Sequence, residues 1–364
     1  MKLIIGFCGD WDKSQKTKGK AFAPFLEPFL AAVTQHQILR INRENSKINY
    51  WRTWKISIPL NFFTRWIQSK KRKNVRFWHL VFRLLRPRCV FAIEPTPEMC
   101  YLAQKYKTKL VEILHFYGLD SSDPKYGLAF EKRQHRLFRP EYNVVFDEKS
   151  YQTRKEIDHL HGSKSFLCKP LIFLPQIPKN QVRPQILYTC QWGYDGEYPF
   201  LNGILKNGFI PEVILETIKK DESIKWLIKL HPVQIQSPKK SKYISILQDS
   251  LGKEKNWQWQ KPSSHSIWEN LSQVDLHVTM SSATVYEAAF VGINSLALCP
   301  SLLSGGIYQN HYSELVEKGY LEKINLKTTG LKQKVDLGIK KKPKPLVLQT
   351  AKSPEEILHQ LLHE

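Results

Sequence analysis

The sequence predicts an α/β protein of two domains, each built on a doubly wound parallel sheet. The first observation is size, because 364 residues, 42% of them hydrophobic, suit two cores of ordinary size. The second is that short apolar runs alternate with helical patterns in both halves of the chain, as they do in parallel-sheet proteins. The third is residues 168–184, whose four prolines in seventeen positions suit an extended connector.

The N-terminal half begins this alternation. We expect strands in four apolar runs: KLIIGFCG, RCVFAIEP, KLVEILHFYG and YNVVFDEKS. A helical pattern covers residues 96–106, and another follows the last run. We therefore predict an N-terminal domain over residues 1–168 and a linker over residues 169–184.

The C-terminal half repeats the pattern. Its expected strands are QILYTCQWG, SIKWLIKLHP, VDLHVTMSS and NSLALCP. Helical patterns cover residues 210–220, a stretch that ends near Gly252, and residues 283–291. We predict a C-terminal domain over residues 185–330.

Residues 331–364 form, on this prediction, a basic tail that ends in a helix. Ser353 is a suitable capping residue, Pro354 takes the first helical position, and Glu356 follows at the third. The chain should therefore end in a helix.

Charge and cysteine content limit the partners and the compartment. Lys and Arg number 55 against 33 Asp and Glu, a net charge of +22, which favours an anionic partner such as nucleic acid, phospholipid headgroups or a phosphorylated substrate. The six cysteines are scattered without a CxxC pair, so we expect reduced thiols in the core. No stretch is apolar enough to cross a membrane, and the first residues do not form a signal peptide, so we expect a cytoplasmic protein.

The strand expected in SIKWLIKLHP ends in polar residues that a core strand does not need. Lys229, His231 and Pro232 stand at its carboxyl end, where open parallel sheets bind their ligands. The alternative is that Lys229 and His231 are ordinary loop residues and that Pro232 only stops the strand.

A second strand end in the same half has the same character. Ser281, Ser282 and Thr284 lie where the strand in VDLHVTMSS gives way to a helix, a position that attracts phosphate. Glu287, one turn into that helix, could accept two hydrogen bonds from a ribose. The alternative is that a serine caps the helix and Glu287 is a solvated helix residue.

The two strand ends together resemble a known family. KLHP followed by SSATVYEAAFVG is similar to the C-terminal half of GT-B glycosyltransferases of capsule and lipopolysaccharide synthesis, in particular Kdo and sialic acid transferases with an HP motif and a Ser-Ser/Thr motif. Teichoic acid glycerophosphotransferases are also similar. The resemblance covers residues 185–300 and implies two Rossmann-like domains facing a cleft. One departure is that Gly292 leads into Ile293 rather than into the family's Lys or Pro.

The resemblance implies a function, a nucleotide-donor domain over residues 185–330 and an acceptor-side domain over residues 1–168. It implies transfer of a sugar from a nucleotide-sugar donor, with a CMP-sugar favoured, to a glycan or lipid-linked glycan acceptor, with inversion and without a cofactor. The donor nucleotide would be bound by Lys229, Pro232, Ser281, Ser282, Thr284 and Glu287. His231 would stabilise the charge on the leaving phosphate, with Lys229 as a helper.

The catalytic base for the acceptor would come from the N-terminal domain. His115, Asp10, Asp12 and Glu94 each follow an expected strand there, so each could face the cleft. Asp10 and Asp12 also form a DxD motif, which binds metal in GT-A enzymes. Because the GT-A context is missing, we expect no metal, and a polar loop is the simpler interpretation.

Residues 51–88 concentrate the basic excess. They hold eleven Lys or Arg, four Trp, four Phe and no acidic residue, a composition typical of a segment lying on an anionic membrane. The alternative is that the rings face the core and the cations are solvated. We expect membrane contact on the inner face of the cytoplasmic membrane, through Lys70, Lys71, Arg72, Lys73, Trp66 and Trp78.

Two other interpretations stay open. A nucleic-acid-binding protein also interleaves basic and aromatic residues, but no RNA- or DNA-binding motif is visible, and we expect no nucleic acid partner. A glycerophosphotransferase or a sugar epimerase would share the fold and the phosphate site. Analysis of the reaction products separates these two enzymes from a glycosyltransferase.

Overall fold

The computed structural model of the chain describes two compact α/β units. Unit 1 comprises Met1–Leu171 and Leu348–Glu364, and unit 2 comprises Ile172–Val347. The described residues are 3–8, 37–42, 49–50, 79, 81–93, 95, 97–114, 117–122, 139–170, 172, 174, 183–191, 204–206, 209–237, 239–326 and 330–363.

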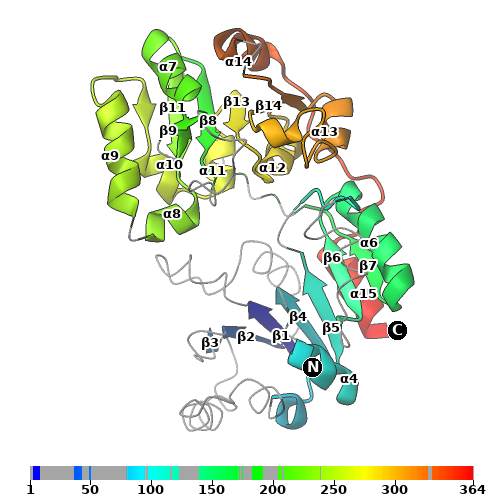
Figure 1. Ribbon diagram of the computed structural model, residues 1–364. Helices are drawn as coiled ribbons and strands as arrows, with labels where there is room; N and C mark the ends of the chain where they lie inside the picture. The colour runs from blue at the N-terminus through cyan, green and yellow to red at the C-terminus, as the bar shows by residue number, and fades with distance from the viewer. Residues whose placement is uncertain are drawn as a thin grey trace. The chain divides into compact units, whose positions relative to one another are not determined.

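Unit 1 is built on a seven-stranded sheet of order β3-β2-β1-β4-β5-β6-β7 (Figure 1). All neighbouring strands are parallel except β2 and β3. The strands are β1 Leu3–Cys8, β2 Gln37–Asn42, β3 Asn49–Tyr50, β4 Cys89–Ile93, β5 Lys109–Ile113, β6 Tyr142–Val145 and β7 Lys164–Leu167. The four strands expected in this half are confirmed, whereas β2, β3 and β7 were not predicted.

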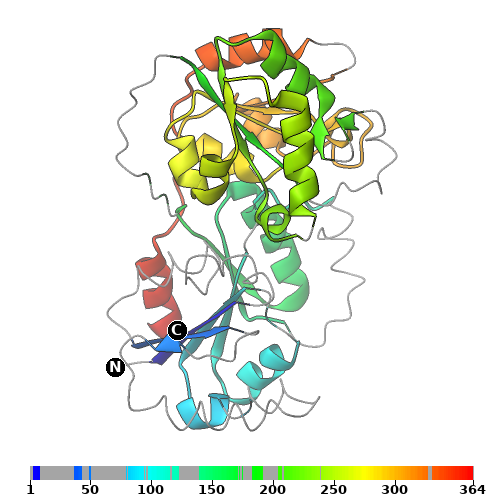
Figure 2. The same cartoon turned by 90° about the vertical axis from the view of Figure 1, so that its left-hand side faces the viewer.

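Helices cover both faces of this sheet. They are helical residues 81–85, α4 Pro97–Lys105, α6 Glu148–His161 and α15 Pro354–His363. Figure 2 shows α6 and α15 on opposite sides of the strands. All five residues of β4 are fully buried, as expected for a strand covered on both faces.

Unit 2 is built on a six-stranded, all-parallel sheet of order β12-β11-β8-β13-β14-β15. Its strands are β8 Gln185–Thr189, β11 Lys225–Lys229, β12 Trp257–Gln258, β13 Leu276–Thr279, β14 Ser295–Ala297 and β15 Leu321–Lys323, with a separate hairpin of β9 Leu205–Lys206 and β10 Ile210–Pro211. Its helices are α7 Glu212–Lys220, α8 Pro232–Gln236, α9 Lys240–Leu251, α10 Gln260–Ser264, α11 Ile267–Leu271, α12 Thr284–Phe290, α13 Ser313–Glu317 and α14 Leu331–Lys340, with a 3₁₀ turn at Pro300–Leu302. The four strands expected in this half are confirmed.

Residues 331–364, which were predicted as a basic tail that ends in a helix, divide between the two units. Helix α14 belongs to unit 2 and contacts α7, β13 and β14. It lies so close to the sheet that a Cβ on Gly338 would come within 2.8 Å of the Leu276 side chain. The segment that follows packs over the end of α12, where Gly292 has a left-handed backbone (φ 72°) and a Cβ would meet the Pro343 carbonyl at 2.7 Å. The sequence departs from the family's pattern directly after Gly292, and this is where the segment after α14 packs closely against the end of α12.

The end of the chain returns to unit 1. The backbone of Lys352 bonds to Leu167 and Lys169 on either side of Cys168, so the segment extends along the edge of β7. Helix α15 then begins with a reciprocal cap, in which Glu356 accepts from the Ser353 N–H at 2.6 Å and donates its own N–H to the Ser353 hydroxyl at 3.2 Å. The predicted helix start is confirmed.

Three further expectations concerned the cysteines, the linker and membrane-spanning segments. The five cysteines whose side chains are described are buried thiols, as expected. The unit boundary, between Leu171 and Ile172, falls inside the predicted linker, most of which lies outside the described residues. No helix within the described ranges is long and apolar enough to span a bilayer.

Candidate functional site

Three loops meet at the carboxyl edge of the sheet in unit 2. They follow β11, β8 and β13, which are neighbours in that order, so the loop after β8 lies between the other two (Figure 1). The loop after β11 carries His231, and the loop after β13 carries Ser281 and Ser282. The two polar strand ends singled out in the sequence are therefore on either side of one central strand.

Gln191 connects the central loop to the loop after β13. Its Oε1 accepts two hydrogen bonds from Ser281, from the backbone N–H at 2.8 Å and from the hydroxyl at 3.1 Å. Tyr312 adds a third restraint, because its hydroxyl donates to the Ser281 carbonyl at 2.9 Å. The position and rotamer of Ser281 are thus fixed from both sides. We did not predict either Gln191 or Tyr312 from the sequence.

Gln234 connects the central loop to the loop after β11. This residue of α8 is buried, with 4% of its surface exposed. Its Oε1 accepts the His231 backbone N–H at 2.8 Å, and its Nε2 donates to the Gln191 carbonyl at 3.1 Å. Hydrogen bonds therefore run without a break from His231 through Gln234 and Gln191 to Ser281. We name these four residues the loop network.

His231 is a neutral imidazole at physiological pH. Burial, helped by the nearby charge of Lys229, lowers the pKa of His231 to about 4. A neutral imidazole carries one N–H, so it can donate a hydrogen bond to an anion without adding a charge. Pro232 begins α8 directly after it, which fixes the turn that presents the ring.

Lys229 ends β11 with its ammonium group bound to main-chain oxygens. Its Nζ donates to the carbonyls of Pro262 at 3.1 Å and His265 at 2.6 Å, in and just after α10. Its charge still influences both His231 and Glu287. Lys229 is thus a fixed positive charge near both groups.

Ser282 and Thr284 form a hydroxyl pair at the start of α12. Their oxygens are 2.8 Å apart, and Ser282 Oγ also accepts the Thr284 N–H at 3.3 Å. The N-cap of α12 is Ala283, which makes no side-chain cap bond, so Ser282 bonds a helix N–H from the position before the cap. Within the pair only one hydroxyl hydrogen is used, and the other has no acceptor among the described residues. That hydrogen is available to a ligand.

Glu287 lies on α12 as a half-buried carboxyl group. Burial raises the pKa of Glu287 to about 7, against the opposing charge of Lys229. No residue within the described part of the chain donates a hydrogen bond to it. Glu287 is thus a desolvated carboxyl group near a fixed cation, unlike the solvated helix residue of the alternative interpretation.

The raised pKa of Glu287 predicts a pH-dependent stability difference. In the unfolded chain the group ionises near pH 4.5, whereas in the folded chain it holds its proton to about pH 7. The folded state is therefore penalised progressively as the pH rises from 4.5 through 7, and not below 4.5. We expect Glu287→Gln to unfold at higher urea concentration than wild type at pH 8, by on the order of 2 kcal/mol after allowance for partial exposure, with no difference at pH 4. An equal difference at both pH values would contradict this assignment.

His277, in the middle of β13, is a structural residue. Its Nε2 bonds to the Thr189 hydroxyl at 2.9 Å and its Nδ1 to the Ser295 hydroxyl at 3.0 Å, so it connects three adjacent strands. Burial lowers the pKa of His277 to about 3. The ring is fully buried, and it holds the sheet together below the loop network.

The other predicted residues lie outside the described part of the chain. This applies to the candidate bases Asp10, Asp12, Glu94 and His115. It also applies to the proposed membrane contacts Trp66, Lys70, Lys71, Arg72, Lys73 and Trp78. The structure accordingly brings together the donor-side residues of unit 2 alone.

Comparisons with known proteins support the fold. No protein-family model matches the sequence, and no curated protein matches it in sequence. Among solved structures, S. aureus MnaA with UDP has a TM-score of 0.62 at 13% identity, covering 99% of this chain and 96% of that one. A UDP-GlcNAc 2-epimerase from Neisseria meningitidis, bound to UDP-GlcNAc, has a TM-score of 0.59 at 14% identity, with both chains covered completely. The glycotransferase of kitacinnamycin has a TM-score of 0.53 at 11% identity, covering 99% and 94%. The chain has two Rossmann-like domains of the GT-B type.

Proposed function

We propose that the chain is a nucleotide-sugar enzyme that transfers a sugar to a glycan or lipid-linked glycan acceptor in the synthesis of cell-surface polysaccharide. The observation that supports this proposal is the loop network, which joins the HP loop and the Ser-Ser loop at one sheet edge. Glu287 lies on the helix that follows. The phosphate and the ribose of a nucleotide could then be held by adjacent loops, with the His231 imidazole beside the phosphate.

The chemistry of the donor site follows from the state of each group. When the bond between sugar and phosphate breaks, negative charge develops on the phosphate, and donors fixed in advance stabilise it without reorganising. The neutral ring of His231 and the spare hydroxyl hydrogen of the Ser282–Thr284 pair would donate to the phosphate. Lys229 would add a positive charge from a position fixed by two carbonyls. Glu287 would accept from the ribose hydroxyls.

The nucleotide has two candidate bases, cytosine and uracil. The HP and Ser-Ser motifs resemble those of enzymes that use CMP-sugars, whereas two of the similar solved structures are complexes with UDP or UDP-GlcNAc. For the acceptor, we propose that one of Asp10, Asp12 and His115 removes its proton, so that transfer inverts the configuration of the sugar.

A second candidate is a sugar epimerase, the activity named for the similar structure from Neisseria meningitidis. An epimerase that breaks the same sugar–phosphate bond would use the same donor site, so the fold cannot separate the two activities. A glycerophosphotransferase would also use it. All three differ in their products.

Product analysis by chromatography and mass spectrometry therefore tests the proposal. Incubation with CMP- and UDP-sugars plus a glycan acceptor should release free nucleotide only when the acceptor is present, with the acceptor gaining one sugar. Interconversion of two nucleotide-sugars without any acceptor would establish the epimerase. Gain of a glycerol phosphate unit by the acceptor would establish the glycerophosphotransferase.

We also propose that residues 51–88 bring the enzyme to the inner face of the cytoplasmic membrane, where a lipid-linked acceptor is found. The support is their composition: eleven cations with eight Trp and Phe and no acidic residue. Each basic residue near an anionic surface contributes about 1 kcal/mol.

Charge reversal at Lys70, Lys71, Arg72 and Lys73 to Glu should release the protein from vesicles. Wild type should float with vesicles containing acidic phospholipid and much less with neutral vesicles. A control that reverses four exposed lysines of unit 2, Lys242, Lys253, Lys255 and Lys318, has the same net charge and should still float. Equal flotation of both variants, or wild type that ignores acidic vesicles and binds RNA, would refute membrane contact through this segment.

A further inference from the structure

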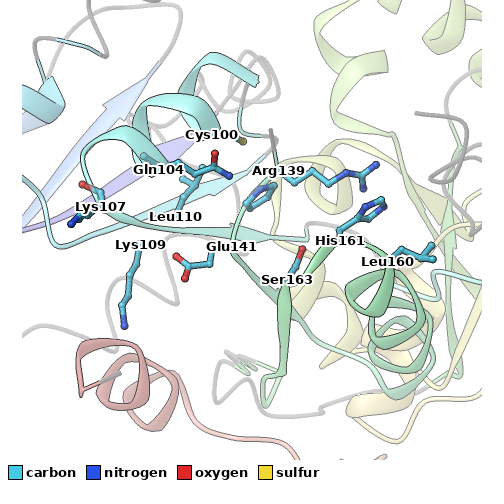
Figure 3. Close-up of a pocket in the computed structure, with 14 residues that line it drawn as sticks. Cys100, Gln104, Lys107, Lys109, Leu110, Arg139, Glu141, Leu160, His161 and Ser163 are labelled. Atoms are coloured by element: carbon cyan, nitrogen blue, oxygen red, sulfur yellow. The ribbon is translucent and has the colours of Figure 1, made fainter. Parts of the chain in front are cut away.

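Two hollows lie at the amino-terminal edge of the sheet in unit 1, at the starts of its strands. The first, with a volume of about 700 Å³, is formed by the ends of α4 and α6 and the starts of β5 and β7 (Figure 3). The second, of about 900 Å³, lies between residues 79–88 and the end of α4. Lys107 and Thr108 line both hollows, so the two are adjacent.

The lining of these hollows is strongly basic. The first hollow has one lining carboxylate, Glu141, and the second has none among the described residues. We name the cations of both hollows the basic edge: Arg83, Arg86, Arg88, Lys105, Lys107, Lys109 and Arg139. Such an excess of positive charge in a concave surface concentrates anions.

Lys109 is the first indication that an anion belongs there. Its Nζ is buried, yet no residue in the described ranges accepts a hydrogen bond from it. Its recorded neighbour is the ring of Tyr142, 5.7 Å from Nζ to the centroid, which is a weak contact. Burying an ammonium group without a hydrogen-bond acceptor costs free energy, and an anionic ligand that accepts a hydrogen bond from it would remove that cost.

The backbone gives a second, independent indication. Arg86 (φ 43°) and Lys107 (φ 52°) both adopt the left-handed conformation where a helix ends, a position that favours glycine. In place of glycine, each position carries a long cationic side chain that lines a hollow. Residues kept in an unfavourable backbone conformation point to a role for their side chains.

We propose that the basic edge is a binding site for phosphate esters, separate from the donor site of unit 2. Lys and Arg together suit phosphate, because Arg forms paired hydrogen bonds and Lys supplies a compact charge. In Figure 3, Arg139 and His161 lie side by side at one end of the first hollow and Lys107 lies toward the other, while the Lys109 side chain extends away from the other labelled side chains. Cations at both ends suit a ligand with more than one phosphate group.

Calorimetry with inorganic pyrophosphate tests this site on the full-length chain. Lys107→Gly and Lys109→Gln should each weaken binding at the basic edge by about tenfold, the loss of one charge-assisted hydrogen bond. Lys155→Gln removes an exposed charge elsewhere in unit 1 and should bind like wild type. Binding at the donor site should respond to none of the three variants.

The melting temperature of Lys107→Gly separates a ligand role from a structural one. Since glycine suits the left-handed backbone, this variant should melt no lower than wild type while it binds pyrophosphate less well. If both variants keep an affinity within twofold of wild type, or if wild type binds no pyrophosphate, the basic edge is not a phosphate site.

Vesicle flotation then identifies the source of the phosphate. Loss of binding to phosphatidylglycerol vesicles in Lys109→Gln, together with loss of pyrophosphate binding, would identify a lipid headgroup. Loss of pyrophosphate binding alone, with flotation unchanged, would identify a soluble phosphate ester. Both outcomes support the site and differ only in the ligand that fills it.

Discussion

His231→Ala is expected to lower turnover by about 10²- to 10³-fold while the protein stays folded, the range measured when one preorganised donor to a developing charge is removed. The side chain can be removed without breaking the loop network, because it is the backbone N–H of His231 that bonds to Gln234. Steady-state kinetics with a nucleotide-sugar donor and a glycan acceptor would measure kcat, and circular dichroism would confirm the fold.

The matched control for this variant is His159→Ala. His159 is an exposed histidine on α6 of unit 1, so its loss should leave kcat unchanged. The pH profile is a second check, since His231, with a pKa of about 4, stays neutral from pH 5 to pH 8. Wild-type turnover in His231→Ala would remove this residue from the mechanism.

Gln191→Met is expected to raise the KM for the donor by about ten- to a hundredfold and to lower stability by about 1–3 kcal/mol. Methionine fills a similar volume but cannot accept the two hydrogen bonds from Ser281, so the backbone N–H and the hydroxyl lose their partner. Because Gln191 positions Ser281 rather than the reacting atoms, the change should affect KM more than kcat.

The control for the loss of an amide is Gln273→Met in the same unit. The amide of Gln273 donates to the Glu269 carbonyl at 2.8 Å, in the loop before β13 and at the opposite edge of the sheet. This variant should lose stability without a change in donor KM. Equal KM values for Gln191→Met and wild type would show that the loop network does not position a donor ligand.

The main strands of both sheets could be predicted because strands buried on both faces appear in the sequence as continuous apolar runs. KWLIK and LHVT became β11 and β13 at the expected places. Strands β2 and β7 were missed since QILRIN and KSFL mix apolar with polar residues, and periodicity alone does not separate such segments from loops.

The sequence analysis did not identify α14, because the many lysines of residues 331–340 made an amphipathic helix resemble a solvated tail. Helix α14 buries Leu331, Val335 and Gly338 among its exposed lysines. The glycine reads as a helix breaker in the sequence, yet in the structure it allows the close approach to Leu276 on β13. Only the neighbouring strand explains why a glycine suits this helix.

The loop network could be predicted in part. Polar residues at two strand ends indicated where the site lies, because carboxyl ends of parallel strands share an edge. The bonds of Gln191 to Ser281 could not be predicted, since these residues are 90 positions apart and meet only through the strand order β11-β8-β13. The available signal was a polar residue two positions after the end of β8, and its importance is clear only when β8 is known to be the central strand of the three.

Calorimetric titration of the full-length chain with UDP and with CMP tests the central claim most directly, namely that the carboxyl edge of unit 2 is a nucleotide site. The proposal predicts that one of these nucleotides binds. It also predicts that Glu287→Ala weakens this binding by about 1.5–3 kcal/mol through loss of the ribose contact, whereas Lys109→Gln leaves it unchanged. The account would be contradicted if neither nucleotide binds, or if Glu287→Ala and Gln191→Met both leave the binding intact.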